Sequence, residues 1–320
     1  MVTAATTAQT DDRRFEDLNR GKANFDRIYE MPDPREYLRV LGGLDYVIPD
    51  LAKGILRTLI ARRARMSGRR VKVLDIGCSY GINAALVRFP LDMQRMAHRY
   101  NHASMHGLPT DRLMKLDTNY FGSWPEQVNA SFVGLDISAA AIDYAKSVGL
   151  IEDGVSANLE TDGVPTEQRS ALSDLDIIVS TGCVGYVTEK TFRRIFSMQK
   201  TGRSPLVASF VLRMFPYDSI EQELAQHGLV TEKLGGVTFV QRRFHSETEL
   251  EATLNAVSAR GLDPQGKETE GLYHAELFVS RPEADIRDNP LSEIVSVTSG
   301  ENRRYGRRYR WGSRKARLMQ

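Results

Sequence analysis

Residues 71–86, VKVLDIGCSYGINAAL, combine an acid with two glycines in a spacing that could bind a ligand. The apolar run predicts a buried strand that ends near Asp75, and the residues from Ile82 onward predict a helix. Gly77 and Gly81 lie in the turn between them, where glycine lets the backbone approach a ligand closely. A carboxylate at this place repels a phosphate and attracts a ligand with a positively charged end.

Two further strand ends carry polar residues. Asp136 lies near the end of a predicted strand at 131–137, and Asn158 lies within another at 154–160. The carboxyl ends of parallel strands meet at one edge of a sheet, where the ligands of such sheets bind. A carboxylate can accept hydrogen bonds from both hydroxyls of a ribose, and an amide can pair with an adenine edge. With a cation beside Asp75, these groups fit S-adenosylmethionine (SAM).

A dinucleotide is the alternative ligand for a turn of this type. NAD requires the spacing GxGxxG, with the helix N-terminus directed at the pyrophosphate. Here the glycines are spaced GxxxG, and the Asp75 carboxylate would face the phosphates at a cost on the order of several kcal/mol. An NAD(P)-dependent oxidoreductase is therefore kept as a weaker alternative.

Four segments resemble, in order, the motifs of the class I SAM-dependent methyltransferases. They are VLDIGCSYG, GLDIS, ANLE and DLDIIVSTGCVGYV, and the resemblance covers roughly residues 71–282. Ser79 stands where the family usually has its middle glycine. The separation in sequence between Asp75 and Asp136 is longer than usual, so residues 88–130 are expected to loop out of the sheet.

The resemblance implies a role for each matching residue. Asp75 would hold the ammonium group of the cofactor, directly or through water, and the Gly77 backbone would contact its methionine end. Asp136 would bind the ribose hydroxyls, Ile137 would pack on the adenine face, and residues 158–159 would read the adenine edge. The implied cofactor-binding residues are Asp75, Gly77, Cys78, Gly81, Asp136, Ile137, Asn158, Leu159 and Thr181.

Tyr186 and His245 are the candidates on the acceptor side of the site. By the same resemblance, residues 181–186 face the transferred methyl group, so Tyr186 could line the acceptor pocket. His245 follows a basic stretch and is a candidate general base, with an exposed or helix-capping histidine as the alternative. Cys183 has no neighbour in the sequence that would activate its thiol, and it is expected to be a small apolar filler.

Short apolar runs that alternate with helical patterns predict the fold. Continuous Val, Ile and Leu runs separated by helices are typical of a parallel sheet with both faces covered. We predict a doubly wound α/β fold with a mostly parallel, seven-stranded sheet, the Rossmann-like fold of these methyltransferases. The predicted strands are 71–76, 131–137, 154–160, 174–180, 205–214 and 272–282, with a further strand-like run, VTFVQRRF.

The pattern divides the chain into three parts. Residues 1–70 are expected to form a tail and a helical cap, residues 71–285 the methyltransferase domain, and residues 286–320 a basic tail. Within the domain, residues 88–130 and 215–244 exceed what the alternating pattern requires. Insertions of this length usually carry function or cover a site.

The composition excludes several classes of protein. The 320 residues are 41% hydrophobic and 26% charged, as in a globular rather than a disordered protein. The two cysteines form neither a disulfide framework nor a metal-binding spacing, which favours the cytoplasm, and no metal site is predicted. No apolar run approaches the roughly 20 residues of a membrane span. Assembly into a homodimer is left open.

The end of the chain is strongly basic. Eight of the 43 Arg and Lys residues lie in the last 18 residues, which contain no acid, so residues 1–302 carry 35 bases and 41 acids, a formal charge of −6. Tyr305, Tyr309 and Trp311 interleave with arginines, a pattern suited to stacking on single-stranded nucleic acid. A solvated tail is favoured over this interpretation and over binding to an acidic partner subunit.

The predicted function is methyl transfer from SAM to an O, N or C nucleophile of a small metabolite, in specialised metabolism. The segment STGC follows the fourth predicted strand, where methyltransferases of nucleobase amino groups have an NPPY-type site. A nucleic acid is therefore a less favoured acceptor. A nucleic-acid methyltransferase or binding module that docks through the basic tail is the alternative.

Overall fold

The computed structural model describes residues 15, 18–19, 21–22, 25–200, 204–287, 289–295, 297, 309–312 and 315–318. The first elements are α2 (Asp26–Tyr29), α3 (Arg35–Gly42), α4 (Ile48–Ser67), β1 (Val71–Ile76), α5 (Ile82–Arg88), α6 (Met93–Tyr100), α7 (Ala103–His106) and α8 (Thr110–Gly122). Next come β2 (Ala130–Asp136), α9 (Ala139–Ser147), β3 (Asp153–Ser156), the 3₁₀ helix η1 (Thr166–Leu172), β4 (Ile177–Thr181), α10 (Glu189–Phe196) and β5 (Leu206–Leu212). The last are α11 (Asp218–Gln226), β6 (Leu229–Lys233), β7 (Phe239–Arg243), α12 (Glu247–Ala259), η2 (Glu268–Glu270), β8 (Leu272–Pro282), α13 (Glu283–Arg287), α14 (Leu291–Ile294), β9 (Tyr309–Gly312) and β10 (Lys315–Leu318).

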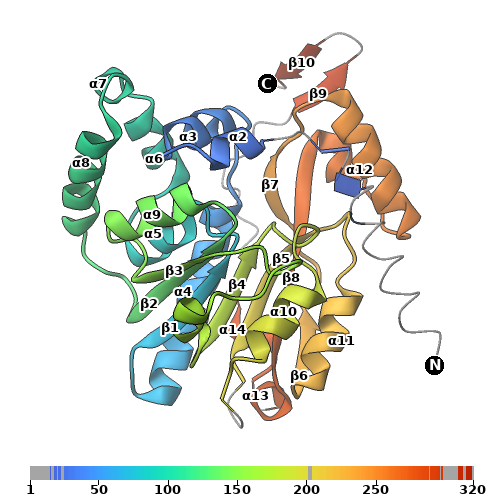
Figure 1. Cartoon of the computed structure of the whole chain (residues 1–320). Coiled ribbons are helices and arrows are strands. Elements are labelled where there is room, and N and C mark those ends of the chain that lie inside the picture. The colour runs from blue at the N-terminus through green and yellow to red at the C-terminus, as the bar shows by residue number, and fades with distance from the viewer. Residues whose placement is uncertain are drawn as a thin grey trace.

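An eight-stranded sheet forms the centre of the molecule (Figure 1). Its order is β3-β2-β1-β4-β5-β8-β6, and β7 pairs with β8 beside that path. The strands from β3 to β5 are parallel, whereas β8 is antiparallel to β5, β6 and β7. The direction of winding reverses between β1 and β4, and ligands of such sheets bind at this switch point. The predicted doubly wound, mostly parallel fold is confirmed.

Residues 215–244 are part of this sheet and not an insertion over it. They supply α11 and β6 at one edge, and then β7, which pairs with β8. The sheet therefore has one strand more than predicted. The alternation in VTFVQRRF indicated a strand but not its neighbour, because pairing depends on side chains that are distant in the sequence.

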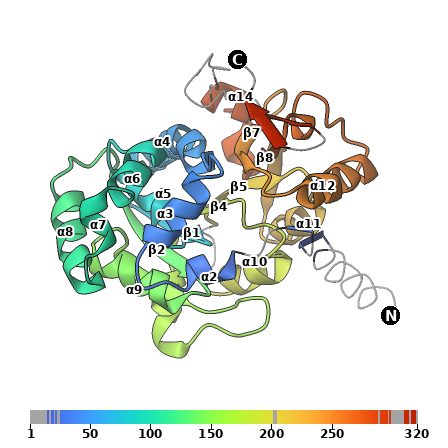
Figure 2. The same ribbon diagram turned by 90° about the horizontal axis from the view of Figure 1, so that it is seen from above.

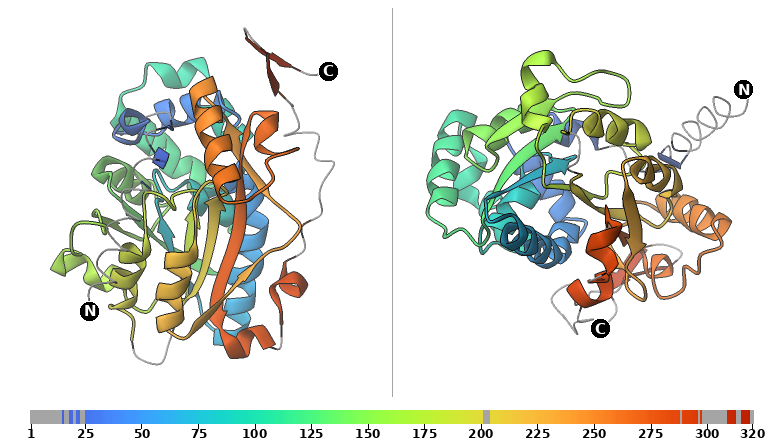
Figure 3. Two further views of the ribbon diagram at one scale, coloured as in Figure 1. Left: turned by 90° about the vertical axis from the view of Figure 1, so that its right-hand side faces the viewer. Right: turned by 90° about the horizontal axis from the view of Figure 1, so that it is seen from below.

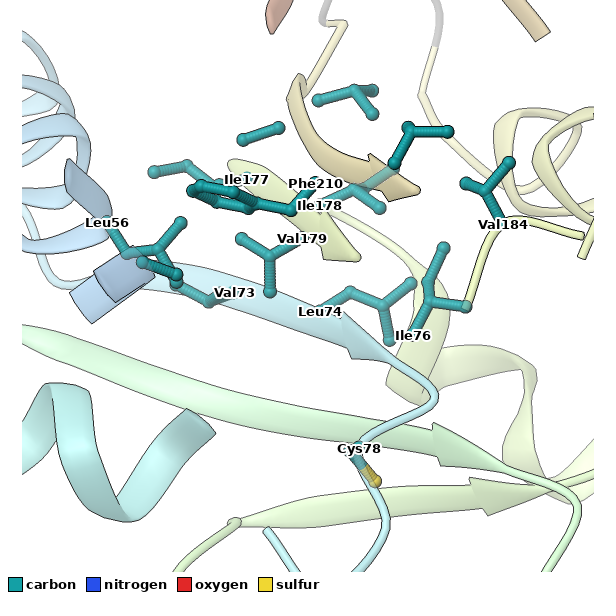
Figure 4. Packing of buried hydrophobic residues seen from close by; sticks show 14 of the residues in the cluster. Leu56, Val73, Leu74, Ile76, Cys78, Ile177, Ile178, Val179, Val184 and Phe210 are labelled. Atoms are coloured by element: carbon teal, nitrogen blue, oxygen red, sulfur yellow. The ribbon is translucent and has the colours of Figure 1, made fainter. Parts of the chain in front are cut away.

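Helices cover both faces of the sheet. α4 packs against β1, β4 and α5, α9 packs on β2 and β3, and α10 packs on α11. Figure 3, left, shows α4 (blue) and α11 (gold) on opposite faces. The main core includes Leu56, Val73, Ile177 and Phe210, which are all at most 1% exposed (Figure 4). Full burial of an apolar side chain of this size contributes about 1.5–3 kcal/mol.

The sequence of α4 explains both its position and its ends. Pro49 suits the first turn because proline lacks the N–H that would be unpaired there, and Gly68 ends the helix with φ +65°. The apolar stripe that includes Leu59 lies in the main core. α4 therefore shares its core with strands that lie beyond the predicted domain boundary at residue 70.

Residues 88–130 loop out of the sheet, as expected. They form α6, α7 and α8 at the side of the molecule next to α5 and α9 (Figure 1). At their centre Asp117 is fully buried and accepts hydrogen bonds from Tyr144 Oη and Arg99 Nη2, each at 2.7 Å. β1 and β2 consequently remain neighbours despite the long connection between them.

The described residues that precede α4, here called the N-terminal segment, lie over the carboxyl ends of β1 and β2, as Figure 2 shows for α2 and α3. Tyr80 Oη donates to the carbonyl oxygens of Ile28 and Met31 at 2.9 and 2.8 Å. Ser138 Oγ donates to the carbonyl oxygen of Tyr29 at 2.6 Å. The segment is therefore fastened to the turns that follow both strands.

The basic tail is described only in part. β9 and β10 form an antiparallel pair apart from the main sheet. Tyr305 lies outside the described residues, as do the side chains of Tyr309 and Trp311. Within the described part of the chain, every helix is too short or too polar to cross a membrane.

Candidate functional site

A cavity of about 810 Å³ lies at the carboxyl ends of β1, β2 and β4, under the N-terminal segment. This volume is within the usual range of small-molecule sites. The wall is formed by the N-terminal segment, the turn after β1, the end of β2, the loops after β3 and β4, and β7. These contribute, among others, Lys22, Tyr29, Gly77, Asp136, Asn158, Thr181, Tyr186 and Arg242.

The turn after β1 is shaped by left-handed backbone. Gly77 has φ +67°, and a Cβ atom at this position would lie 2.9 Å from Cys183 Cβ. Ser79 adopts φ +49°, a conformation that usually favours glycine, and its N–H donates to Asp136 Oδ2 at 2.8 Å. This bond joins the turns after β1 and β2, and both Gly77 and Ser79 line the cavity.

The Asp75 carboxyl group is fully buried and does not line the cavity. Asn83 Nδ2, from α5, donates to Asp75 Oδ1 at 2.9 Å and to Thr181 Oγ1 at 2.8 Å. Among the described residues, Asp75 Oδ2 has no hydrogen-bond partner. Burial raises the pKa of Asp75 to about 7, against the opposing effect of the Asn83 hydrogen bond. Asp75 therefore lies behind the wall and is joined to it through Asn83 and Thr181.

Asp136 does reach the cavity. Besides the bond from Ser79, its Oδ1 accepts the N–H of Ser138 at 3.0 Å. Burial raises the pKa of Asp136, and these backbone hydrogen bonds oppose the rise. Each carboxylate oxygen has two acceptor sites, so Asp136 can accept from ligand hydroxyls while it fixes the turns. Ser138 also begins α9, because its Oγ accepts the N–H of Ala141 at 3.2 Å.

Ile137 is an apolar side chain that lines the cavity yet is 73% exposed. It lies between Asp136 and Ser138, whose backbone and side chains are both fixed by hydrogen bonds. An exposed large apolar group beside two polar ones is suited to contact a flat apolar ligand surface.

The loop after β3 is held by its own polar groups. Asn158 Oδ1 accepts the N–H of Glu160 at 3.0 Å, which leaves its amide N–H₂ group for the cavity that Asn158 lines. Leu159 is buried and also lines the cavity. Glu160 accepts the N–H of Thr188 at 2.9 Å and its hydroxyl at 2.6 Å, so this loop is tied to the start of α10.

The loop after β4 supplies Thr181 and Tyr186 to the wall. Tyr186 is 54% exposed and its ring faces the ammonium group of Lys22. Cys183 Sγ lies 3.0 Å from Ser180 Oγ, and burial raises the pKa of the Cys183 thiol to about 12. Cys183 is therefore a protonated, wall-forming thiol at neutral pH, which agrees with its expected role as a filler.

Besides Asp75, three other predicted site residues do not line the cavity. Cys78 is buried with its sulfur against Gly134 in β2, apart from the side chains above β1 (Figure 4). Gly81, with φ +76°, precedes α5 and packs against Leu150. His245 is exposed where β7 turns into α12, its backbone N–H donates to Glu249 Oε2 at 2.7 Å, and its ring packs edge-on against Phe25 with 5.8 Å between the centroids. The structure thus does not bring the predicted base to the site.

Two basic residues that the sequence did not single out do line the cavity, Lys22 and Arg242. Arg242 is 4% exposed and forms two hydrogen bonds with the fully buried Glu249, at 2.6 and 3.0 Å. Lys22 lies in the N-terminal segment, far from Arg242 in the chain. No local pattern marks this pair, because the two residues are 220 positions apart and come together only through the fold.

Replacing Glu249 with glutamine is expected to lower the free energy of unfolding by about 3–5 kcal/mol, because Arg242 would be left as a buried charge without its partner. Urea unfolding of the full chain measures this. Glu251→Gln changes an exposed residue of the same helix and should alter stability by no more than about 0.5 kcal/mol. Equal effects of the two substitutions would contradict a structural role for the ion pair.

Some solved structures resemble the chain at low identity. The plantazolicin methyltransferase BpumL in complex with S-adenosylhomocysteine (SAH) aligns with a TM-score of 0.42 and 10% identity over 87% of this chain and 99% of that chain. Magnesium protoporphyrin IX methyltransferase (ChlM) from Synechocystis PCC 6803, with bound SAM, gives 0.34 and 12% over 72% and 79%. A TehB-like SAM-dependent methyltransferase from Corynebacterium glutamicum gives 0.33 and 17% over 70% and 88%. No family model and no curated protein sequence matches the chain. Because these scores are low, the fold is assigned from the observed strand order and the function from the site itself.

Proposed function

We propose that the chain is a class I SAM-dependent methyltransferase that binds SAM over β1 and β2 and a methyl acceptor over β4 and β7. The observation that carries this proposal is the Asp136 carboxylate, which opens onto the same cavity as the glycine turn after β1. A carboxylate with acceptor sites to spare suits the two hydroxyls of a ribose.

The hydrogen bonds of the turn after β1 argue against a dinucleotide as the ligand. A pyrophosphate at this place needs free N–H groups at the start of the helix. Four N–H groups of the turn already donate to carbonyl or carboxylate oxygens, namely those of Gly77, Cys78, Ser79 and Gly81. These four N–H groups are therefore not available to cradle a phosphate, which favours a ligand without phosphate.

The residues present fit SAM in two further respects. Gly77 lines the cavity without a side chain, so the ligand can contact its backbone. Asp75 Oδ2 is a buried carboxyl oxygen without a partner among the described residues, two residues before Gly77, and a cationic ligand end on the other side of the wall would favour its charged form. When bound, SAM would supply an activated methyl group on its sulfonium. Asp136, Ile137 and Asn158 would hold the ribose and adenine.

The chain's own contribution to the reaction would be orientation and the exclusion of water. A heteroatom of the acceptor must approach the methyl carbon in line with the bond that breaks, and positioning of this kind supplies much of the rate. Thr181 and Tyr186 lie on the wall of the acceptor half, and the N-terminal segment covers it. These features support a small acceptor that is enclosed by the protein.

Calorimetry with SAH and with NADH tests the proposal. We expect SAH to bind to the full chain and NADH not to bind, because four N–H groups of the turn after β1 already donate to protein oxygens. Binding of NADH alone would show that the site belongs to an oxidoreductase. A screen of small metabolites for methyl uptake then identifies the acceptor.

The nature of the acceptor and the cellular setting are part of the same proposal. We assign a small metabolite as acceptor, and the cytoplasm as location, which the two free cysteines support. The basic residues 303–320 keep a nucleic-acid acceptor as the second candidate. Deletion of residues 303–320 separates the two: loss of tight, steeply salt-dependent RNA binding would favour the nucleic acid.

A further inference from the structure

Lys22 is a lysine whose ammonium group lies inside the acceptor half of the cavity. Its Nζ is 4.3 Å from the centroid of the Tyr186 ring and 5.5 Å from that of Phe215. Among the residues that the structure describes, none of the carboxylates forms an ion pair with it. The two rings favour the charged form of this half-buried lysine, whereas partial burial without a carboxylate partner makes that form costly to keep.

The surrounding charges add to this cost. Arg242 of β7 lines the same cavity, and its guanidinium group uses both oxygens of Glu249 of α12, one of which also accepts the backbone N–H of His245. Glu249 is thus already engaged and compensates Arg242 rather than Lys22. Burial and the nearby Arg242 lower the pKa of Lys22 to about 7, against smaller opposing effects of Glu249 and Cys183.

Three other titratable groups of the cavity wall do not supply a base, and burial raises the pKa of one of them, Tyr29, so that it keeps its proton at neutral pH. Burial raises the pKa values of both Cys183 and Tyr46 to about 12, so that both keep their protons at neutral pH. His245 is exposed outside the cavity. A neutral lysine amine, by contrast, is an effective proton acceptor when burial and a neighbouring cation hold it uncharged.

We propose that Lys22 is the general base of the methyl transfer, which rests on the function proposed above. The Lys22 amine takes the proton from a hydroxyl or ammonium group of the acceptor. The freed electron pair of the acceptor heteroatom forms the bond to the methyl carbon, and the electron pair of the broken carbon–sulfur bond stays on sulfur. The proton on Lys22 then passes to solvent before the next cycle.

The first test needs neither cofactor nor acceptor. The full chain is labelled with a trace of acetic anhydride across a range of pH, and the labelling of Lys22 is followed by mass spectrometry against Nα-acetyl-lysine as calibrant. A midpoint near 7 is expected for Lys22. A midpoint at the ordinary lysine value of about 10.4 would overturn the proposal.

The second test separates a base from an anchor for an anionic ligand, with benzoate as the probe. Lys22→Arg keeps the positive charge but cannot accept a proton at neutral pH, whereas Lys22→Met removes both properties. If Lys22 is a base, benzoate should leave the labelling of Lys22 unchanged. Protection by benzoate, with binding to wild type and Lys22→Arg but not to Lys22→Met, would instead identify an anion site.

The third test uses turnover and cofactor binding together. With an acceptor from the metabolite screen, both substitutions should lower kcat by roughly 10²–10⁴-fold. Wild-type kcat in Lys22→Arg would refute the assignment of Lys22. SAH affinity should change by less than about threefold in both variants, because Asp136 and the first turn are untouched. Failure of the wild-type chain to bind SAH would refute the proposed function itself, whatever the labelling midpoint of Lys22.

Discussion

Asp136→Ala is expected to weaken the binding of SAH by about 100-fold. Hydrogen bonds to a charged group contribute about 1.5–3 kcal/mol each, and the ribose offers two hydroxyls to one carboxylate. A loss of about 2.8 kcal/mol corresponds to that change in affinity. Isothermal titration of the variant with SAH measures it. Asp136→Asn keeps one acceptor oxygen, so its loss should be smaller.

The control for this substitution must separate binding from folding. Asp136 also accepts the N–H groups of Ser79 and Ser138, so its removal is expected to cost stability as well. Titrations are therefore made well below the melting temperature of each variant. Asp143→Ala alters an exposed acid of α9 and should leave SAH affinity unchanged. If Asp136→Ala folds and binds SAH as tightly as Asp143→Ala does, the ribose assignment is wrong.

Gly77→Val is expected to reduce SAH binding below detection. Even the first carbon of the side chain would lie 2.9 Å from Cys183 Cβ, and the backbone at φ +67° is unfavourable for a β-branched residue. Because Gly77 and Cys183 both line the cavity, the valine would also change the wall where a ligand can contact backbone. Gly77→Ala should show the same effect to a smaller degree, and calorimetry with SAH compares the two.

Two further substitutions identify the cause of that loss. Gly149→Ala places a methyl group at φ +75° with no atom within 4 Å, so it carries the backbone strain alone and should leave SAH binding intact. Gly77→Ala combined with Cys183→Gly removes the contact between the two Cβ atoms. Recovery of SAH binding in this double variant would assign the loss to a displaced turn, whereas persistent loss would assign it to a blocked ligand contact. Normal binding in Gly77→Val would refute the placement of the ligand.

Much of the fold followed from local patterns. The strand at 71–76 and the closing strand at 272–282 were predicted with the bounds that the structure gives. Ser138 was expected to cap a helix and does so. β3 is shorter than predicted, because Asn158 folds its side chain back on the N–H of Glu160 and begins a turn. Side chain to backbone bonds of this kind compete with strand pairing over a few residues, and apolar alternation does not report them.

In the candidate site, too, local patterns placed some residues correctly and others not. Asp136, Asn158 and Tyr186 line the cavity as expected. Asp136 ends β2, the other two lie in the loops after β3 and β4, and the carboxyl ends of parallel strands meet at one edge. Asp75 lies one residue before the end of β1, in register with Gly134 of β2, and its carboxyl group lies behind the wall. Its carboxyl group is turned toward Asn83 of α5, and which side of a strand end faces a ligand is decided by the helix packed against it.

By itself, the sequence determined the alternation of strands and helices, the glycine turn after β1 and the acid at the end of β2, because these depend on residues near one another in the chain. Only the tertiary structure decided that Lys22 and Arg242 share a cavity, that His245 lies outside it, and that β7 joins the sheet. Such contacts are fixed by the packing of segments far apart in the sequence, where burial and neighbouring charge set the chemistry of each group.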